Sequence, residues 1–143
     1  IDYDKKLFVD KHGIFEKGFY TNSFHVNVDS DLIAFDKIQK EGPFHEICNG
    51  GCITYVELKE APIGNDEGLR EYVECAIKSG VHYLGFNFPK DVCDNCGASG
   101  VFDICPVCGG KNITRIRRVS GYLEILDGFT KGKKNEVKTR KEN

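Results

Sequence analysis

Four cysteines in the second half of the chain have the spacing of metal ligands. They form two C-x₂-C pairs, Cys93 with Cys96 and Cys105 with Cys108, and eight residues separate the pairs. A glycine follows each pair, and glycine permits the tight turn that directs backbone N–H groups toward sulfur. Four thiolates can close a tetrahedron around one ion, which is typical of structural zinc and leaves no position for water. The pattern predicts zinc ahead of iron and is silent about activity.

Gly121 lies in a second stretch that could carry chemistry, the sequence RRVSGYL at 117–123. On local grounds this glycine ends a strand in a turn with positive φ. Glycine also suits a stored backbone radical. A radical at its Cα is planar, is stabilised by the amide nitrogen on one side and the carbonyl group on the other, and meets no side chain. The two arginines, Arg117 and Arg118, either orient this segment, bind a partner protein or line a solvated strand edge, and the local sequence leaves these alternatives open.

The remaining cysteines and two histidines have simpler explanations. Cys48 and Cys52 flank an Asn-Gly-Gly turn and have the spacing of a redox pair, but free cysteines are commonly buried as small hydrophobic residues. Cys75 is expected in the core, near the apolar face of a helix. His25 and His45 lie in apolar and aromatic stretches, where histidines are more often structural than functional.

The composition is that of a folded protein of about one domain. Of the 143 residues, 40% are hydrophobic and 29% are charged, which excludes disordered, collagen-like and low-complexity classes. No apolar run reaches the roughly 18 residues of a membrane-spanning helix. No export signal is visible, so a reducing cytoplasm is the expected location. The sequence begins at Ile1 in a charged stretch and lacks Met, so we expect a piece of a longer chain.

Charge is distributed unevenly along the chain. Residues 1–110 contain 10 Lys and Arg against 18 Asp and Glu, whereas residues 111–143 contain 10 against 4. A basic end on an acidic body indicates docking to nucleotide, nucleic acid or an acidic protein surface. For the last dozen residues alone, a solvated tail is the simpler interpretation.

Two strands and a short helix are predicted outside the central unit, which is described in the next paragraph. Aromatic and β-branched residues predict a strand over 17–28, and a similar pattern predicts a strand over 112–119. Between the first of these and the central unit, a short helix is expected, with its N-cap within 29–31 and its end at Gly42-Pro43.

The clearest unit is a strand, a helix and a second strand. The strands are predicted over 52–58 and 81–88, and the helix begins at Asn65 or Asp66 and ends before Gly80, which suits the C′ position. This spacing is typical of a βαβ crossover, which implies an α/β fold with a parallel sheet or barrel.

The order of these features resembles a known family. Five blocks carry the resemblance, namely FYTNSFHVNV at 19–28, GPFHEICNGGCITYVEL at 42–58, HYLGFNFP at 82–89, CDNC with CPVC within 93–108, and RRVSGYL at 117–123. Together they resemble the C-terminal portion of the anaerobic (class III) ribonucleoside-triphosphate reductases, the glycyl-radical ribonucleotide reductases. The resemblance extends from about Phe19 to Arg140. It favours the radical interpretation of Gly121 over the turn interpretation.

The resemblance implies a fold and a set of site residues. Residues 1–90 would form the end of a ten-stranded α/β barrel, 91–112 a zinc-binding ribbon, and 113–143 a glycyl-radical loop with a basic C-terminal tail. Gly121 would store the radical. The zinc that braces its loop would be held by Cys93, Cys96, Cys105 and Cys108.

The resemblance also implies an oxidoreductase with several partners. A separate radical-SAM activase carrying a 4Fe-4S cluster would remove a hydrogen atom from Gly121. The radical would then pass to a cysteine in the remainder of the reductase chain, which would reduce ribonucleoside triphosphates. Nucleotide effectors would bind that missing part, the full-length enzyme would be a homodimer, and this chain alone would be inactive. Neither membrane nor nucleic acid is expected as a partner.

Two alternatives belong to other classes of protein. One is a stand-alone zinc-ribbon module that grips nucleic acid with its basic tail. The other is a spare glycyl-radical carrier subunit, similar to those that repair oxygen-cleaved pyruvate formate-lyase. The βαβ unit argues against the first alternative and the zinc knuckles argue against the second.

Overall fold

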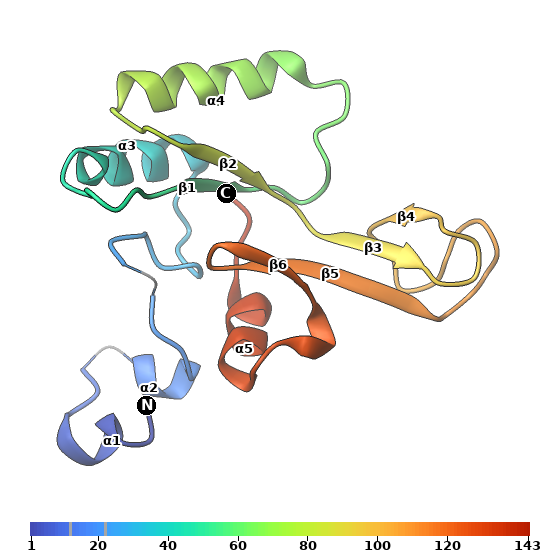
Figure 1. Ribbon diagram of the computed structural model, residues 1–143, viewed down its shortest axis with the longest axis horizontal. Helices are drawn as coiled ribbons and strands as arrows, with labels where there is room; N and C mark the ends of the chain where they lie inside the picture. The colour runs from blue at the N-terminus through green and yellow to red at the C-terminus, as the bar shows by residue number, and fades with distance from the viewer. Residues whose placement is uncertain (12, 22) are drawn as a thin grey trace.

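The computed structural model describes residues 1–11, 13–21 and 23–143, which form two small sheets and several helices (Figure 1). In chain order the elements are α1 (Asp4–Leu7), α2 (Ile14–Lys17), α3 (Ala34–His45), β1 (Thr54–Glu57), α4 (Asp66–Lys78), β2 (Leu84–Asn87), β3 (Lys90–Cys93), β4 (Ser99–Gly100), β5 (Ile113–Val119), β6 (Tyr122–Ile125), the 3₁₀ turn η1 (Leu126–Gly128) and α5 (Lys131–Thr139). Within the described ranges, no helix is both long and apolar enough to cross a membrane.

β1, α4 and β2 form the predicted βαβ crossover. The two strands pair in parallel, with Thr54 opposite Leu84. The Asn65 side chain accepts a hydrogen bond from the Gly68 N–H at 3.2 Å, as an N-cap does. Gly80 follows α4 with a φ of 79°, the left-handed conformation expected at C′. Both predicted ends of this helix are therefore confirmed.

The core lies where α3 and α4 pack together beside the parallel strands (Figure 1). Its fully buried apolar residues are Ala34, Ile38, Val56 and Ala76. Cys75 is one of the partly buried residues packed against them, as predicted from its position on the helix. The fold is mixed α/β, in agreement with the sequence.

A second sheet continues from the first. β3 begins at Lys90, just beyond the end of β2 at Asn87, and the strand order is β4-β3-β5-β6 with every neighbouring pair antiparallel. The strand predicted over 112–119 is β5. Its first residue, Ile113, lies opposite Cys93, and its last leads into the segment that contains Gly121. β5 therefore connects the two parts of the chain in which chemistry was expected.

The strand predicted over 17–28 is wrong for the described residues of that range, and Asn22 lies outside them. Lys17 ends α2, and among the residues described between it and α3 none belongs to a strand. The backbone polar groups of this segment find partners outside any ladder. The Val26 N–H donates to Glu41 Oε1 at 2.9 Å, and the Val28 carbonyl accepts from the Lys141 N–H at 2.8 Å. An aromatic, β-branched sequence forms a strand only where another strand is available to pair with it.

Both predicted boundaries of the helix that follows this segment, α3, are also wrong. α3 begins at Ala34 without a side-chain cap and continues through Pro43 to His45. Gly42 serves a packing role, because a Cβ there would lie 2.1 Å from the Ser79 carbonyl oxygen after α4. Glycine thus permits close approach of the two helices. Pro43 is exposed in the last helical turn, and α3 continues past it without the backbone hydrogen bond that proline cannot donate.

Candidate functional site

The two cysteine pairs form backbone knuckles with the same hydrogen-bond pattern. Gly97 donates its N–H to the Cys93 carbonyl, and Gly109 donates to the Cys105 carbonyl, each at 2.9 Å. Cys93 and Cys105 in turn donate their own N–H groups to carbonyls five residues later, also at 2.9 Å. Both glycines are left-handed, with φ values of 75° and 71°. The repeated turn places two thiols on the same side of each knuckle.

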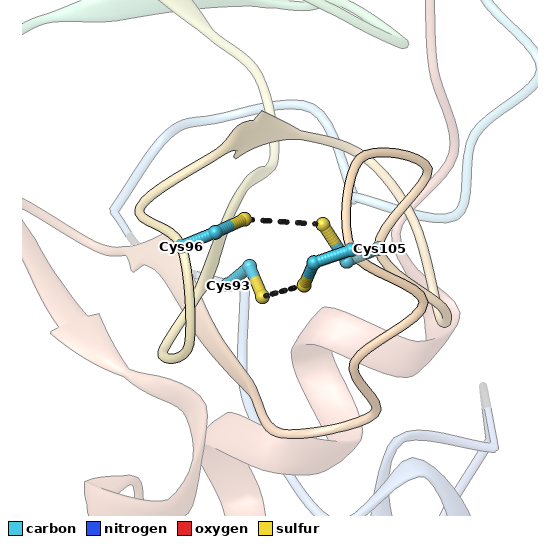
Figure 2. A group of neighbouring side chains, drawn as sticks. Cys93, Cys96 and Cys105 are labelled. Carbon is cyan, nitrogen blue, oxygen red and sulfur yellow. Dashed lines mark hydrogen bonds between the residues drawn. The ribbon is translucent and has the colours of Figure 1, made fainter.

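The structure brings the four predicted ligand residues together. The Sγ atoms of Cys93 and Cys108 are 3.6 Å apart, those of Cys96 and Cys105 are 3.5 Å apart, and all four lie within 4.8 Å of one another (Figure 2). Four sulfurs bound to one zinc at about 2.3 Å would be separated by roughly 3.8 Å in a tetrahedron. The donor set and its spacing therefore fit a four-thiolate metal site.

The same backbone favours the thiolate form at one of these positions. The N–H of Cys108, assisted by that of Val107, lowers the pKa of Cys105 to about 6 against the opposing effect of burial. Hydrogen bonds to the charged form stabilise it. Cys93 and Cys105 are buried, whereas Cys96 and Cys108 are exposed. The cluster is therefore closed on one side by the ribbon and open to solvent on the other.

Asp91 fastens the segment between the knuckles to β5. Its side chain is buried, accepts the Phe102 N–H at 3.2 Å, and pairs with Arg117 Nη1 at 2.6 Å. Thr114 Oγ1 also donates to Asp94 at 2.7 Å. These contacts hold the cysteine ribbon to the strand that leads to Gly121. Across the seven residues of β5 the ribbon and the glycine are separated by about 20 Å.

Gly121 lies in a two-residue turn between β5 and β6. Val119 pairs with Tyr122, so Ser120 and Gly121 are the central residues. A tight hairpin requires positive φ at its first central residue, and Ser120 has a φ of 57°. Gly121 lies outside the left-handed region, and a Cβ on it would meet no atom within 4 Å. The expectation of a positive φ at Gly121 is therefore wrong, because the serine before it supplies that conformation.

A cavity of about 330 Å³ lies beside this hairpin. Gly121 and Ser120 line it together with cationic side chains from α3, from β5 itself and from the residue that follows α5. These cations are Lys37, Arg118 and Arg140. The sequence pattern did not single out Lys37 or Arg140, because a buried charge depends on partners that are remote in sequence. Burial lowers the pKa of Lys37, and its ammonium group donates to the Tyr55 carbonyl at 2.6 Å.

The structure also shows the surroundings of Cys52 beside Cys48 and of the two histidines singled out in the sequence. Cys52 lines the cavity, and burial together with a hydrogen bond to Cys48 raises the pKa of its thiol. The two thiols therefore lie near each other, and both are half-buried, so the redox-pair and the buried-hydrophobe interpretations both stay open. His25 and His45 have hydrogen-bond partners, respectively Glu41 at 3.2 Å and Thr54 at 2.9 Å, which agrees with structural roles for both.

The sequence is similar to those of known proteins. The chain matches the family model for anaerobic ribonucleoside-triphosphate reductase over residues 1–142. The chain belongs to this family. It is 37% identical over 150 residues to the anaerobic ribonucleoside-triphosphate reductase of Enterobacteria phage T4, a match that covers 94% of this chain and 24% of the relative. It is 38% identical over 139 residues to that of Escherichia coli strain K12, with 90% and 19% covered.

Solved structures of anaerobic ribonucleotide reductases resemble the fold. One has a TM-score of 0.68 at 25% identity and covers 82% of this chain and 19% of its own. Another, from Thermotoga maritima with MES in the active site, has a TM-score of 0.60 at 27% identity and covers 73% and 17%. The chain spans about a quarter of the length of the phage T4 reductase and about a fifth of that of the Escherichia coli reductase. The relatives favour the reductase interpretation over the nucleic-acid module and the radical-carrier subunit.

Proposed function

We propose that this chain is the radical-bearing and metal-bearing part of an anaerobic ribonucleoside-triphosphate reductase, with Gly121 as the residue that stores the radical. The observation that carries the proposal is the RVSGY hairpin at the end of β5, directly after a four-cysteine cluster, in a chain of this family. Residues 1–90 contribute to an α/β barrel, 91–112 form the metal ribbon, and 113–143 contain the radical hairpin and the basic tail.

Gly121 acts by giving up and regaining one hydrogen atom at Cα. A radical-SAM activase takes that atom and leaves the planar backbone radical. In turnover, a cysteine thiol of the remaining reductase chain returns a hydrogen atom to Gly121 and itself becomes the radical that attacks the ribonucleotide.

Cys93, Cys96, Cys105 and Cys108 are the residues that would hold zinc. The ion supplies structural cross-linking, because four thiolates fill its coordination shell and leave no position for a reacting molecule. The chain's own contribution is to transmit that rigidity. The hydrogen bond of Asp91 to the Phe102 N–H and the pairing of β3 with β5 connect the ribbon to the strand that leads to the hairpin.

The remaining partners belong to the complete enzyme. We propose that ribonucleoside triphosphates and nucleotide effectors bind the rest of the reductase, which works as a cytoplasmic homodimer, and that this chain does not turn over alone. Structures of related reductases with dATP and CTP bound support nucleotides as ligands of the complete protein.

Electron paramagnetic resonance of the complete reductase tests this proposal. After anaerobic activation with the activase and S-adenosylmethionine, the wild type should show a doublet from coupling to the single remaining α-hydrogen of Gly121. Air should then destroy the signal and cut the chain at Gly121.

Two variants make the assignment specific to one glycine. Gly121→Ala should lose the doublet, the cleavage and the activity. Gly50→Ala is the matched control, because Gly50 is also exposed, lies outside the left-handed region and would have no atom within 4 Å of an added Cβ. A Gly121→Ala enzyme that keeps the doublet and reduces nucleotides would refute the proposal.

A further inference from the structure

Arg118 contacts the peptide bond that precedes Gly121. Its Nη1 group donates to the Ser120 carbonyl oxygen, and its side chain is 11% exposed. The guanidinium also stacks on Tyr55 of β1, with its Cζ atom 3.4 Å from the ring centroid. One buried cation therefore joins the hairpin to the parallel sheet.

The hydrogen bond from Arg118 fixes the orientation of the peptide plane next to Gly121 Cα. The Ser120 carbonyl and the Gly121 N–H belong to the same planar peptide group, so holding the oxygen also orients the amide nitrogen. The peptide on the other side of Gly121 is held by the pairing of Tyr122 with Val119. Both peptide groups that would share a radical at Gly121 are thereby held in the resting hairpin.

Glu57 holds Arg118 in place. Arg118 Nη2 donates to Glu57 Oε1 at 3.0 Å, and the Glu57 side chain is 8% exposed at the end of β1. The same carboxylate accepts from Asn87 of β2 and, at 3.3 Å, from Arg140. Burial lowers the pKa of Arg118 while Glu57 opposes that effect. The carboxylate thus compensates the buried charge and sets its direction.

We propose that Glu57 and Arg118 are positioning residues for the radical: Glu57 orients Arg118, and Arg118 fixes the Ser120–Gly121 peptide so that its amide nitrogen overlaps the radical centre. This inference rests on the proposed storage of the radical at Gly121. Neither side chain reacts. Their role is to hold the Ser120–Gly121 peptide in one orientation, so that the unpaired electron is delocalised in the same way in every molecule.

Arg118→Lys and Glu57→Gln in the complete reductase test the proposal against a matched control. Lysine keeps the charge and loses the fork that contacts Ser120 and Glu57 together. Glutamine keeps the size of Glu57, so it provides the test if the lysine variant does not fold. Arg117→Lys is the control, because Arg117 is the neighbouring arginine with a buried carboxylate partner, Asp91. Its guanidinium donates to Asp91 and to the Lys90 and Ile116 carbonyls, whereas that of Arg118 donates to Ser120 and Glu57. Zinc content and melting temperature check that each variant is folded.

The first measurement needs no radical. Hydrogen exchange of the amides at 119–122 should become about tenfold faster in Arg118→Lys and Glu57→Gln, as expected for loss of a charge-assisted hydrogen bond. Exchange at these amides should be unchanged in Arg117→Lys. Unchanged exchange in both test variants would overturn the proposal.

The second measurement is the shape of the radical signal after activation. In both test variants the doublet should change its splitting and lose resolution, because rotation of the Ser120–Gly121 peptide alters the spin density at Cα. The control should keep the wild-type doublet. Faster exchange with an unaltered doublet would also overturn the proposal, since the hairpin would then be held for stability alone. Absence of the doublet in the wild type would instead refute radical storage at Gly121.

Discussion

Arg140 and Glu57 form a largely buried ion pair between positions 83 residues apart. Arg140 Nη1 lies 3.3 Å from both carboxylate oxygens, and the two side chains are 11% and 8% exposed. Arg140 Nη1 also donates to the Arg118 carbonyl at 3.0 Å. The segment after α5 is therefore part of the fold, and the interpretation of the last dozen residues as a solvated tail is wrong. Burial of a charge requires partners, and for Arg140 these are Glu57 and Glu136, whose Oε1 accepts from Arg140 Nη2 at 2.5 Å.

Arg140→Ala should lower the free energy of unfolding by roughly 1–3 kcal/mol, because it removes hydrogen bonds between charged groups and leaves part of a buried carboxylate unpaired. Lys141→Ala is the control. Lys141 pairs with Asp31, but the two side chains are 48% and 87% exposed, and exposed pairs contribute little. Urea denaturation of both variants would measure the difference. Equal effects would contradict a structural role for Arg140.

The purified protein should bind one zinc ion, and Cys105→Ser should lose it. The four Sγ atoms lie within 4.8 Å of one another, and removal of one thiolate opens a shell that needs all four. Cys48→Ser should keep the metal, because Cys48 neighbours Cys52 and lies outside this cluster. Metal analysis of the three proteins distinguishes these outcomes. Loss of zinc from Cys48→Ser, or equal substoichiometric zinc in all three, would show that the ligands are misassigned.

His45 connects the end of α3 to β1 and to the segment that leads into β2 through a chain of hydrogen bonds. The His82 N–H donates to His45 Nδ1 at 3.1 Å, so the neutral ring carries its proton on Nε2 and donates to Thr54 Oγ1 at 2.9 Å. Thr54 Oγ1 donates in turn to Glu41 Oε2 at 2.8 Å. Glu41 also contacts His25. Burial lowers the pKa of His45 below its ordinary 6.5, with His82 acting in the same direction and Glu41 against it.

This arrangement predicts a loss of stability on acidification. Below pH 6.5 the unfolded chain binds a proton at His45 that the folded chain resists, so the free energy of unfolding falls as the pH decreases toward the lowered pKa. His45→Gln keeps a donor and an acceptor without the titration and should show a weaker pH dependence. Urea denaturation of both proteins above and below pH 6.5 measures the difference, in which the shared titration of the cysteines cancels. Identical slopes would show that His45 does not contribute.

The features predicted correctly from sequence depend on near neighbours in the chain. The apolar spacing of α4, its cap at Asn65 and its end at Gly80 are local, and the two cysteine knuckles are each closed within six residues. The features that were missed depend on remote partners. Residues near Val26 bond to Glu41 instead of forming a strand, and Arg140 is buried because it meets Glu57. No periodic pattern encodes such pairs.

Substitutions at the two central residues of the hairpin at 119–122 should change the free energy of unfolding in opposite directions. Gly121→Ala should leave the free energy of unfolding unchanged or raise it by up to about 1 kcal/mol, because alanine tolerates this backbone and reduces the freedom of the unfolded chain. Ser120→Val should lower it by roughly 1–2 kcal/mol, since a β-branched residue is strained at a φ of 57°. Denaturation of both variants in the absence of activase provides the measurement.

The stabilities of these two variants decide how the radical experiment is interpreted. A Cβ on Gly121 would meet no atom within 4 Å, so loss of the radical in Gly121→Ala would reflect chemistry at Cα and not collapse of the hairpin. Ser120→Val keeps Gly121 and strains the peptide before it, so it should retain a radical with an altered doublet. If Gly121→Ala proved the more destabilising of the two, the left-handed residue would have to be Gly121, and the alanine variant could no longer separate loss of the radical from loss of the turn.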